Sequence, residues 1–137
     1  MWHFINLYIT WDKKSKSIDI LIGIENISSG GGNDIVYGNK ESNTLNGGTG
    51  NDLLIGGKGN DKLIGGEGKD IFKLSKGEGY DLIQDFENNQ DKIFIGSIKK
   101  LKLKNRGKNV CIYNGKDLLA KVKGAKDDLS FKGKYLA

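Results

Sequence analysis

Apolar residues recur at a fixed interval in the middle of the chain, with neighbours of mixed polarity. Residues 29–73 divide into five consecutive units of nine residues, and the eighth place of every unit is apolar. Side chains of a strand alternate between two faces, so the last three places of each unit predict a short strand that buries only its middle residue. The residues at this place are Val36, Leu45, Leu54, Leu63 and Phe72.

The other places of the unit follow the pattern G-G-x-G-x-D-x-U-x, in which U is apolar. Units 47–55, 56–64 and 65–73 match it at every specified place, unit 29–37 lacks only the leading glycine, and unit 38–46 is degenerate. Glycines at places one, two and four allow positive φ, so the backbone can turn tightly and direct carbonyl oxygens into a small space. Aspartate at place six adds a carboxylate. Hard oxygen ligands in a flexible loop suit Ca²⁺.

Two consecutive units form one coil of eighteen residues, so strands eighteen residues apart are expected to stack in the same sheet. The predicted fold is all-β: a parallel β-roll of two short parallel sheets, with antiparallel capping strands at its ends. The place-six residues then form two columns, Asp34, Asp52 and Asp70 along one edge and Asn43 with Asp61 along the other.

The stacked carboxylates predict a link between metal binding and folding. Parallel strands lie about 4.8 Å apart, so neighbouring carboxylates in a column repel by roughly 3 kcal/mol at an effective dielectric constant near 20. A calcium ion bound between the coils attracts both carboxylates, so the net electrostatic interaction between the coils becomes favourable. We therefore expect the repeats to fold when they bind calcium.

A glycine-rich flexible linker is the alternative interpretation of the repeat region. It accounts for the glycines, since 13 of the 21 in the chain fall between Gly30 and Gly68 and proline is absent. It does not account for an aspartate and an aliphatic residue that recur, two places apart, at intervals of nine residues. The repeat pattern therefore favours a metal-dependent fold over a linker.

Residue types outside the repeats exclude several classes of function. One cysteine, Cys111, excludes an internal disulfide, and one histidine, His3, leaves little for zinc binding or nucleophilic catalysis. Neither H-E-x-x-H nor G-x-S-x-G occurs, so the sequence does not predict an enzyme. Residues 1–97 contain 10 Lys and Arg against 14 Asp and Glu, whereas residues 98–137 contain 12 against 3, so an acidic body precedes a basic tail.

At these repeats the chain resembles the RTX (repeats-in-toxin, haemolysin-type) calcium-binding proteins. Residues 19–27 resemble the lead-in strand of that family, and residues 79–86 with 91–93 resemble the closing segment of serralysin-type C-terminal domains. The resemblance implies a secreted bacterial protein that a type I secretion apparatus exports unfolded and that folds outside the cell on calcium. We expect no cleaved signal peptide and no membrane span, because the apolar start lacks a cationic region and a small-residue cleavage site.

The resemblance also implies the calcium ligands, namely place-six side chains and carbonyl oxygens of the loops. The site with Asn43 is expected to be the weakest, because an amide replaces a charge. Asp81 and Asp85 are either a further site at the C-terminal end or a plain solvated turn. The candidate metal residues are Asp34, Asn43, Gly47, Thr49, Gly50, Asp52, Gly56, Lys58, Gly59, Asp61, Gly65, Glu67, Gly68, Asp70, Asp81 and Asp85.

The regions on either side of the repeats are expected to cap the roll. Residues 1–28 are predicted as N-terminal capping strands and residues 74–137 as a C-terminal β cap, with a hairpin at Asn114-Gly115 between two apolar runs. The C-terminal lysines are expected to form a solvated face rather than a nucleic-acid surface, with weak contact to anionic polysaccharide or lipid as the alternative.

Three functions remain open at the level of sequence. The first is a calcium-binding module with a structural role. The second is the non-catalytic C-terminal module of a larger secreted protease, lipase or toxin. The third is an adhesin fragment, and nothing in the sequence selects its partner.

Overall fold

The computed structural model describes residues 6–8, 18–19, 26–77, 79–125 and 129–137, and these residues form strands and turns without a helix. None of them therefore belongs to a helix that is long and apolar enough to span a bilayer. The strands are β1 (Asn6–Tyr8), β2 (Ile18–Asp19), β3 (Asn26–Ser28), β4 (Ile35–Tyr37), β5 (Thr44–Thr49), β6 (Leu53–Ile55), β7 (Lys62–Glu67), β8 (Ile71–Lys73), β9 (Asp81–Ile83), β10 (Lys92–Phe94), β11 (Leu101–Arg106), β12 (Asn109–Asn114), β13 (Asp117–Lys123), β14 (Phe131–Lys132) and β15 (Tyr135–Leu136).

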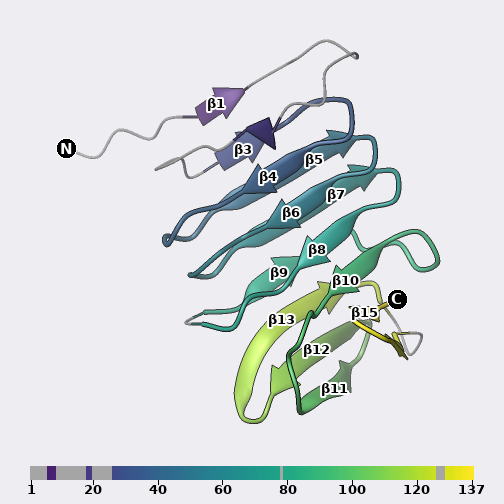
Figure 1. Ribbon diagram of the computed structural model, residues 1–137. Helices are drawn as coiled ribbons and strands as arrows, with labels where there is room; N and C mark the ends of the chain where they lie inside the picture. Colours follow the sequence, from purple (N-terminus) through teal and green to yellow (C-terminus); the bar gives the residue numbers. More distant parts are fainter. Residues whose placement is uncertain (1–5, 9–17, 20–25, 78, 126–128) are drawn as a thin grey trace.

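Successive strands of the repeats alternate between two parallel sheets, which confirms the predicted β-roll (Figure 1). One sheet contains β3, β5, β7 and β9 in order, and the other contains β4, β6, β8 and β10. Leu45 pairs with Leu63 in the first sheet, and Leu54 pairs with Phe72 in the second. Both pairs are eighteen residues apart, as two units per coil require.

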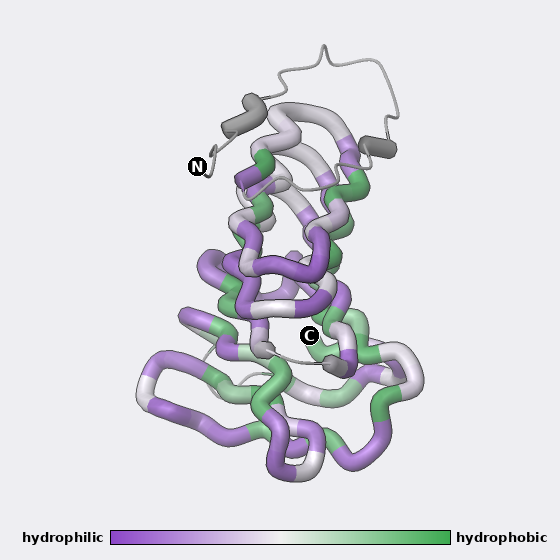
Figure 2. The backbone as a smooth tube through the Cα atoms, turned by 90° about the vertical axis from the view of Figure 1, so that its left-hand side faces the viewer, coloured by the Kyte–Doolittle hydropathy of each residue, from purple (hydrophilic) through white to green (hydrophobic). Residues whose placement is uncertain are grey.

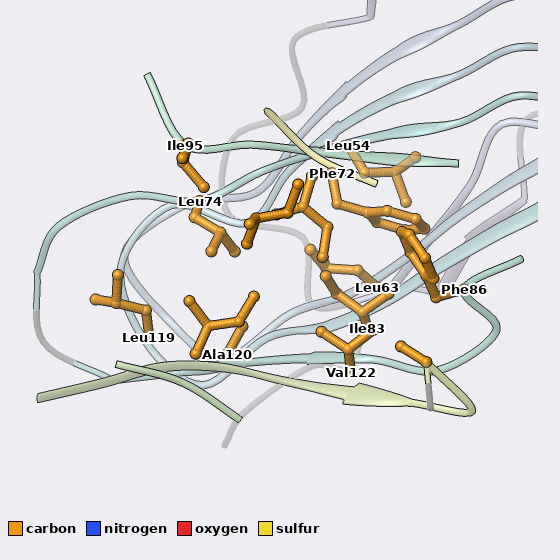
Figure 3. Close-up of a cluster of buried hydrophobic side chains, with 14 of the residues drawn as sticks. Leu54, Leu63, Phe72, Leu74, Ile83, Phe86, Ile95, Leu119, Ala120 and Val122 are labelled. Carbon is orange, nitrogen blue, oxygen red and sulfur yellow. The ribbon is translucent and has the colours of Figure 1, made fainter. Parts of the chain in front are cut away.

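The core is a double ladder with one apolar side chain from each strand. In the first sheet Leu45, Leu63 and Ile83 stack on one another, and in the second Leu54 stacks on Phe72. These five side chains have no exposed surface. Figure 3 shows the ladders meeting at the C-terminal end, where further apolar residues widen the core. In Figure 2 hydrophobic stretches recur up both sides of the roll, between paler and more hydrophilic loops.

Two strands of the repeat region are longer than the sequence pattern predicts. The expected strands 44–46 and 62–64 extend to Thr49 and Glu67. The glycine-containing places one to three of the next units continue the parallel ladder, with Thr49 paired to Glu67. Glycine is a weak strand former by itself, so this pairing depends on the neighbouring coil and cannot be read from a single unit.

The C-terminal region extends both sheets beyond the last coil. The strand β13 pairs in parallel with β9, and β12 and β11 follow it in antiparallel order, while β15 and β14 add antiparallel strands beyond β10. The hairpin predicted at Asn114-Gly115 joins β12 to β13, and Gly115 has a φ of 65°. Val122 pairs with Ile83 in one sheet and Leu136 pairs with Ile93 in the other, so both apolar ladders continue into this cap. Val122 and Leu136 are fully buried.

The N-terminal end differs from the expected antiparallel cap. The strand β1 pairs in parallel with β3, and β2 pairs in parallel with β4, so both continue the roll. The predicted cap also contained Trp2 and Trp11, which lie outside the described residues. The proposed division of the chain at residues 28 and 73 stays a prediction.

Candidate calcium sites

The loops between the sheets stack directly on one another because glycines occupy the places of closest approach. Gly48 and Gly66 at place two have φ values of 93° and 94°, and Gly50 and Gly68 at place four have 127° and 131°. L-residues rarely adopt such values. A Cβ atom on Gly66 would collide with the carbonyl oxygen of Gly48 in the preceding coil. Carbonyl oxygens of one loop therefore face the next loop.

The glycine at place one has a different role from the one that the sequence suggested. Gly47, Gly56 and Gly65 do not adopt positive φ. A Cβ atom on Gly56 would instead collide with Oδ2 of Asp61, the place-six residue of its own unit. Gly47 and Gly65 stand in the same relation to Asp52 and Asp70. Place one is therefore glycine because the carboxylate folds back over it.

The place-six residues form two columns, one along each edge of the roll. In the first column, the backbone N–H of Asp34 donates to Oδ1 of Asp52 at 2.8 Å, and that of Asp52 donates to Oδ1 of Asp70 at 2.8 Å. In the second column, the N–H of Asn43 donates to Oδ1 of Asp61 at 2.8 Å. Each carboxylate therefore holds the backbone of the preceding coil, and the two predicted columns are present in the structure.

The second carboxylate oxygen is what makes these columns candidate cation sites. Oδ2 of Asp52, Asp61 and Asp70 is buried and has no hydrogen-bond partner among the residues that the structure describes. These side chains are only 2%, 2% and 1% exposed. A buried charged oxygen without a partner is unfavourable, so it requires either a proton or a cation.

Burial of the columns shifts the protonation of their carboxyl groups. Burial, with a smaller contribution from the charge of Asp34, raises the pKa of Asp52 to about 6, although the hydrogen bond from the Asp34 backbone N–H lowers it. The pKa values of Asp61 and Asp70 are also raised, again chiefly by burial. For Asp81, burial and the charge of Asp61 raise the pKa to about 8. A divalent cation between the coils would remove this penalty on the charged forms.

The place-three residues contribute backbone rather than side-chain oxygens to the loop stack. The carbonyl of Thr49 accepts from the N–H of Gly32 at 2.8 Å, and that of Glu67 accepts from the N–H of Gly50 at 2.8 Å. Both lie in the loops of the first column. Lys58 takes the same place in a loop of the second column, where Gly57 and Gly59 also have positive φ, and its side chain is exposed.

Asp81 and Asp85 lie at opposite edges of the roll rather than in one common site. Asp81 is buried beside Asp61 and prolongs the second column. Asp85 accepts hydrogen bonds from the N–H groups of Gly65 at 2.9 Å and Gly66 at 2.8 Å, so it covers the loop of the first column that begins at Gly65. Both oxygens of Asp85 are therefore committed to backbone groups.

Asp91 is a column residue that sequence reasoning missed. Its Oδ1 accepts from the N–H of Asp70 at 3.0 Å and its Oδ2 from the N–H of Glu87 at 2.8 Å, and the side chain is 2% exposed. Asp91 stands twenty-one residues after Asp70 instead of eighteen, so it falls outside the nonapeptide register. The signal that could have found it is Asp91-Lys92-Ile93, which repeats the Asp-x-apolar end of a unit.

The donor set of the columns fits calcium. No group of three or more His, Cys, Asp or Glu side chains gathers around one point in the described part of the chain. An ion here would be held by one or two carboxylates and by loop carbonyls. All-oxygen coordination with many backbone ligands is characteristic of Ca²⁺, whereas zinc requires nitrogen or sulfur.

A parallel β-roll with stacked Gly-Asp loops defines the class of calcium-binding repeat proteins. Residues 20–54 and 37–72 match the family model of the RTX calcium-binding nonapeptide repeat, which spans four copies. This part of the chain is therefore similar to the RTX repeats, which bind Ca²⁺. No curated protein matches the chain.

Proposed function

We propose that this chain is a calcium-dependent folding module of a secreted bacterial protein, with Ca²⁺ held between the stacked loops of both columns. The ligands of the first column are Asp34, Asp52 and Asp70 with the carbonyls of the loops at 47–50 and 65–68. Those of the second column are Asn43, Asp61 and Asp81 with the carbonyls of 56–59. The work of the module is binding and structural rather than catalytic.

One observation carries the calcium assignment. Oδ2 of Asp52, Asp61 and Asp70 is buried without a hydrogen-bond partner in the described residues, although Oδ1 of each is bonded to the neighbouring coil. The carboxylate is thus oriented with one oxygen left for a further ligand. Carbonyl oxygens of the adjacent loop supply the other donors that Ca²⁺ prefers.

The composition of the core supports calcium-driven folding. Each repeat strand buries one apolar side chain, while the glycine-rich loops lose much backbone entropy when they become ordered. One apolar side chain per strand therefore buries too little apolar surface to balance this entropic cost. The calcium sites exist only between ordered coils, so the free energy of calcium binding adds directly to the free energy of folding.

Action outside the cell is consistent with this dependence on calcium. RTX repeat proteins are typically secreted by bacteria. Extracellular calcium modules bind with dissociation constants of about 10⁻⁴–10⁻³ M, a range in which cytosolic calcium leaves the sites empty. The chain would then stay unfolded for passage through a type I secretion apparatus and fold after export.

A calcium titration of the full chain tests this proposal. Circular dichroism should show little β-structure in EGTA and a cooperative gain with rising Ca²⁺, while Mg²⁺ at the same concentrations should give much less. Calorimetry should count the ions. The exposed Asp117→Asn variant serves as the control for a general loss of acidic charge, beside Asp61→Asn in the second column. A full β-spectrum in EGTA, or an unaltered ion count in Asp61→Asn, would refute the proposal.

A further inference from the structure

Basic side chains, most of them from the C-terminal cap, form a face on the outer side of the larger sheet. We name this the cationic face. Cross-strand neighbours point to the same side of a sheet, so the register places these side chains together. Lys104 pairs with Cys111, Cys111 with Lys121, Lys121 with Leu82, and Leu82 with Lys62. The face consists of Lys62, Lys102, Lys104, Arg106, Lys121 and Lys123.

Three of these lysines form a row across five neighbouring strands. Lys62, Lys121 and Lys104 lie on β7, β13 and β11, with one strand between each pair. Strands are separated by about 4.8 Å, so successive backbone positions of the row are spaced by about 9.6 Å. Figure 1 shows β13, β12 and β11 side by side at the C-terminal end of the roll.

No carboxylate of the described residues neutralises the charges of this face. None of its six cations forms an ion pair with a carboxylate in the described part of the chain. Lys121 lies over the ring of Tyr80 at 4.8 Å, and Lys104 lies over the ring of Tyr113 at 5.1 Å. These contacts hold two ammonium groups in place, which lowers the entropic cost of binding an anion.

A hollow of about 390 Å³ lies beside the row. Lys62, Lys121 and Lys123 line it together with the amides of Asn60 and Asn109. Asp61 also borders the hollow, but it is 2% exposed and belongs to the second column. The hollow therefore offers positive charges next to amide donors and acceptors.

We infer that the cationic face binds an anionic polysaccharide that carries about one charge per disaccharide. The spacing of the lysine row is close to the length of a disaccharide in an extended chain, and the amides of the hollow suit sugar hydroxyl groups. A negatively charged polymer of this kind would lie across the strands with its charges on Lys62, Lys121 and Lys104. This inference is independent of the calcium assignment.

Two other polyanionic partners fit the face less well. Phosphates follow one another at about 3.4 Å of axial rise along a DNA strand, which is far denser than the lysine row. One face of each neighbouring tyrosine ring is already covered by a lysine, which disfavours base stacking. For a membrane, the exposed large apolar residues of the described chain, Tyr37 and Phe131, lie in the opposite sheet.

Binding of hyaluronan, which has one carboxylate per disaccharide, tests the inference. The full chain in saturating calcium should bind it, and the row variant Lys62→Gln/Lys104→Gln/Lys121→Gln should bind at least about tenfold more weakly. The matched control Lys73→Gln/Lys132→Gln/Lys134→Gln removes three exposed lysines elsewhere and has the same net charge. It should stay within about twofold of the parent.

Several outcomes would overturn the assignment. These are equal weakening in both triple variants, absence of hyaluronan binding by the parent, or tighter binding of oligo-dT or phosphatidylserine vesicles than of hyaluronan. Circular dichroism in calcium checks that the row variant is folded. Should it not fold, Lys104→Gln alone, on the edge strand β11, is compared with Lys132→Gln, and equal affinities would again refute the role of the row.

Discussion

The backbone N–H of Asp52 donates a hydrogen bond of 2.8 Å to Oδ1 of Asp70, one coil further along the roll. The other oxygen of Asp70 is buried without a hydrogen-bond partner among the described residues. One side chain therefore performs two tasks, since it joins two coils directly and also presents a free oxygen to the space between them. Coil stacking and the requirement for a cation thus arise from the same residue.

Replacement of column carboxylates should separate these two tasks. Asp70→Asn keeps a carbonyl oxygen that can accept from Asp52, but it removes the buried charge. We expect the calcium midpoint of folding to rise by about tenfold, because ligand charge sets calcium affinity, with β-structure in EGTA unchanged or increased. Calcium titration by circular dichroism measures both. Exposed Asp117→Asn should leave the midpoint unchanged, and a lower midpoint in Asp70→Asn would contradict the role of its charge.

Acidification should stabilise the calcium-free fold and weaken calcium binding. The folded-state pKa of Asp81 is about 8, against an ordinary value of 3.8, so the folded chain binds the additional proton between these values. Stability in EGTA should therefore increase as the pH falls from about 8 towards 4, and the pKa of Asp52 near 6 acts in the same direction. Circular dichroism in calcium-depleted buffer at pH 8 and pH 5 measures this as a gain of β-structure at the lower pH.

Competition between protons and calcium provides the second half of that test. Ca²⁺ binds the charged carboxylates, so the calcium midpoint should rise as the pH is lowered through the same range. The Asp81→Asn variant should lose a large part of this pH dependence. A calcium-free fold that is more stable at pH 8 than at pH 5 would show that these carboxyl groups do not control folding.

The coil could be predicted from the sequence because the nine-residue repeat is strict and can be recognised locally. Leu45 and Leu63 occupy the same place two units apart, and this interval alone determines which strands stack. Asp91 was missed because three extra residues separate it from Asp70 beyond the eighteen of the repeat. The parallel pairing of β13 with β9 depends on where the chain returns after β11 and β12, which no local pattern specifies.

The reason for the first glycine of the unit also could not be read from the repeat. Its position suggested a turn that needs positive φ, as at Gly48 and Gly50. In the structure, the folded-back carboxylate of the same unit occupies the space that a side chain would take, as at Gly56 and Asp61. That contact depends on the rotamer of a residue five places later, which is a property of the assembled loop.

Gly56→Ala should therefore damage the roll through the calcium ligand itself. The added methyl group would displace the Asp61 carboxylate, and we expect a loss of about 2 kcal/mol in the free energy of unfolding in calcium together with a raised calcium midpoint. Gly77→Ala is the matched control, because its Cβ would meet only Cγ of Lys58, at 3.7 Å. Denaturant unfolding in saturating calcium compares the two. Equal losses would indicate that glycine acts through backbone entropy alone.

A ladder of asparagines at place five should stabilise the loop stack without any contribution from calcium. The N–H of Asn51 donates to Oδ1 of Asn33 at 2.8 Å, and Oδ1 of Asn51 accepts from the N–H of Lys69 at 2.8 Å. These asparagines are exposed. Their side chains accept from the backbone of the following coil, whereas the aspartate side chains accept from the backbone of the preceding coil. Asn51→Ala removes one acceptor and should lower the free energy of unfolding by about 1 kcal/mol in saturating calcium.

The number of bound ions distinguishes the two ladders. Because the side chain of Asn51 bonds to a backbone N–H of the next coil, calorimetry on Asn51→Ala should count as many calcium ions as the parent binds. Asp52→Ala, the adjacent residue of the same loop, should lose an ion as well as stability. An ion lost from Asn51→Ala would mean that place five belongs to the calcium site, and the separation between metal-dependent and metal-independent stacking would then be wrong.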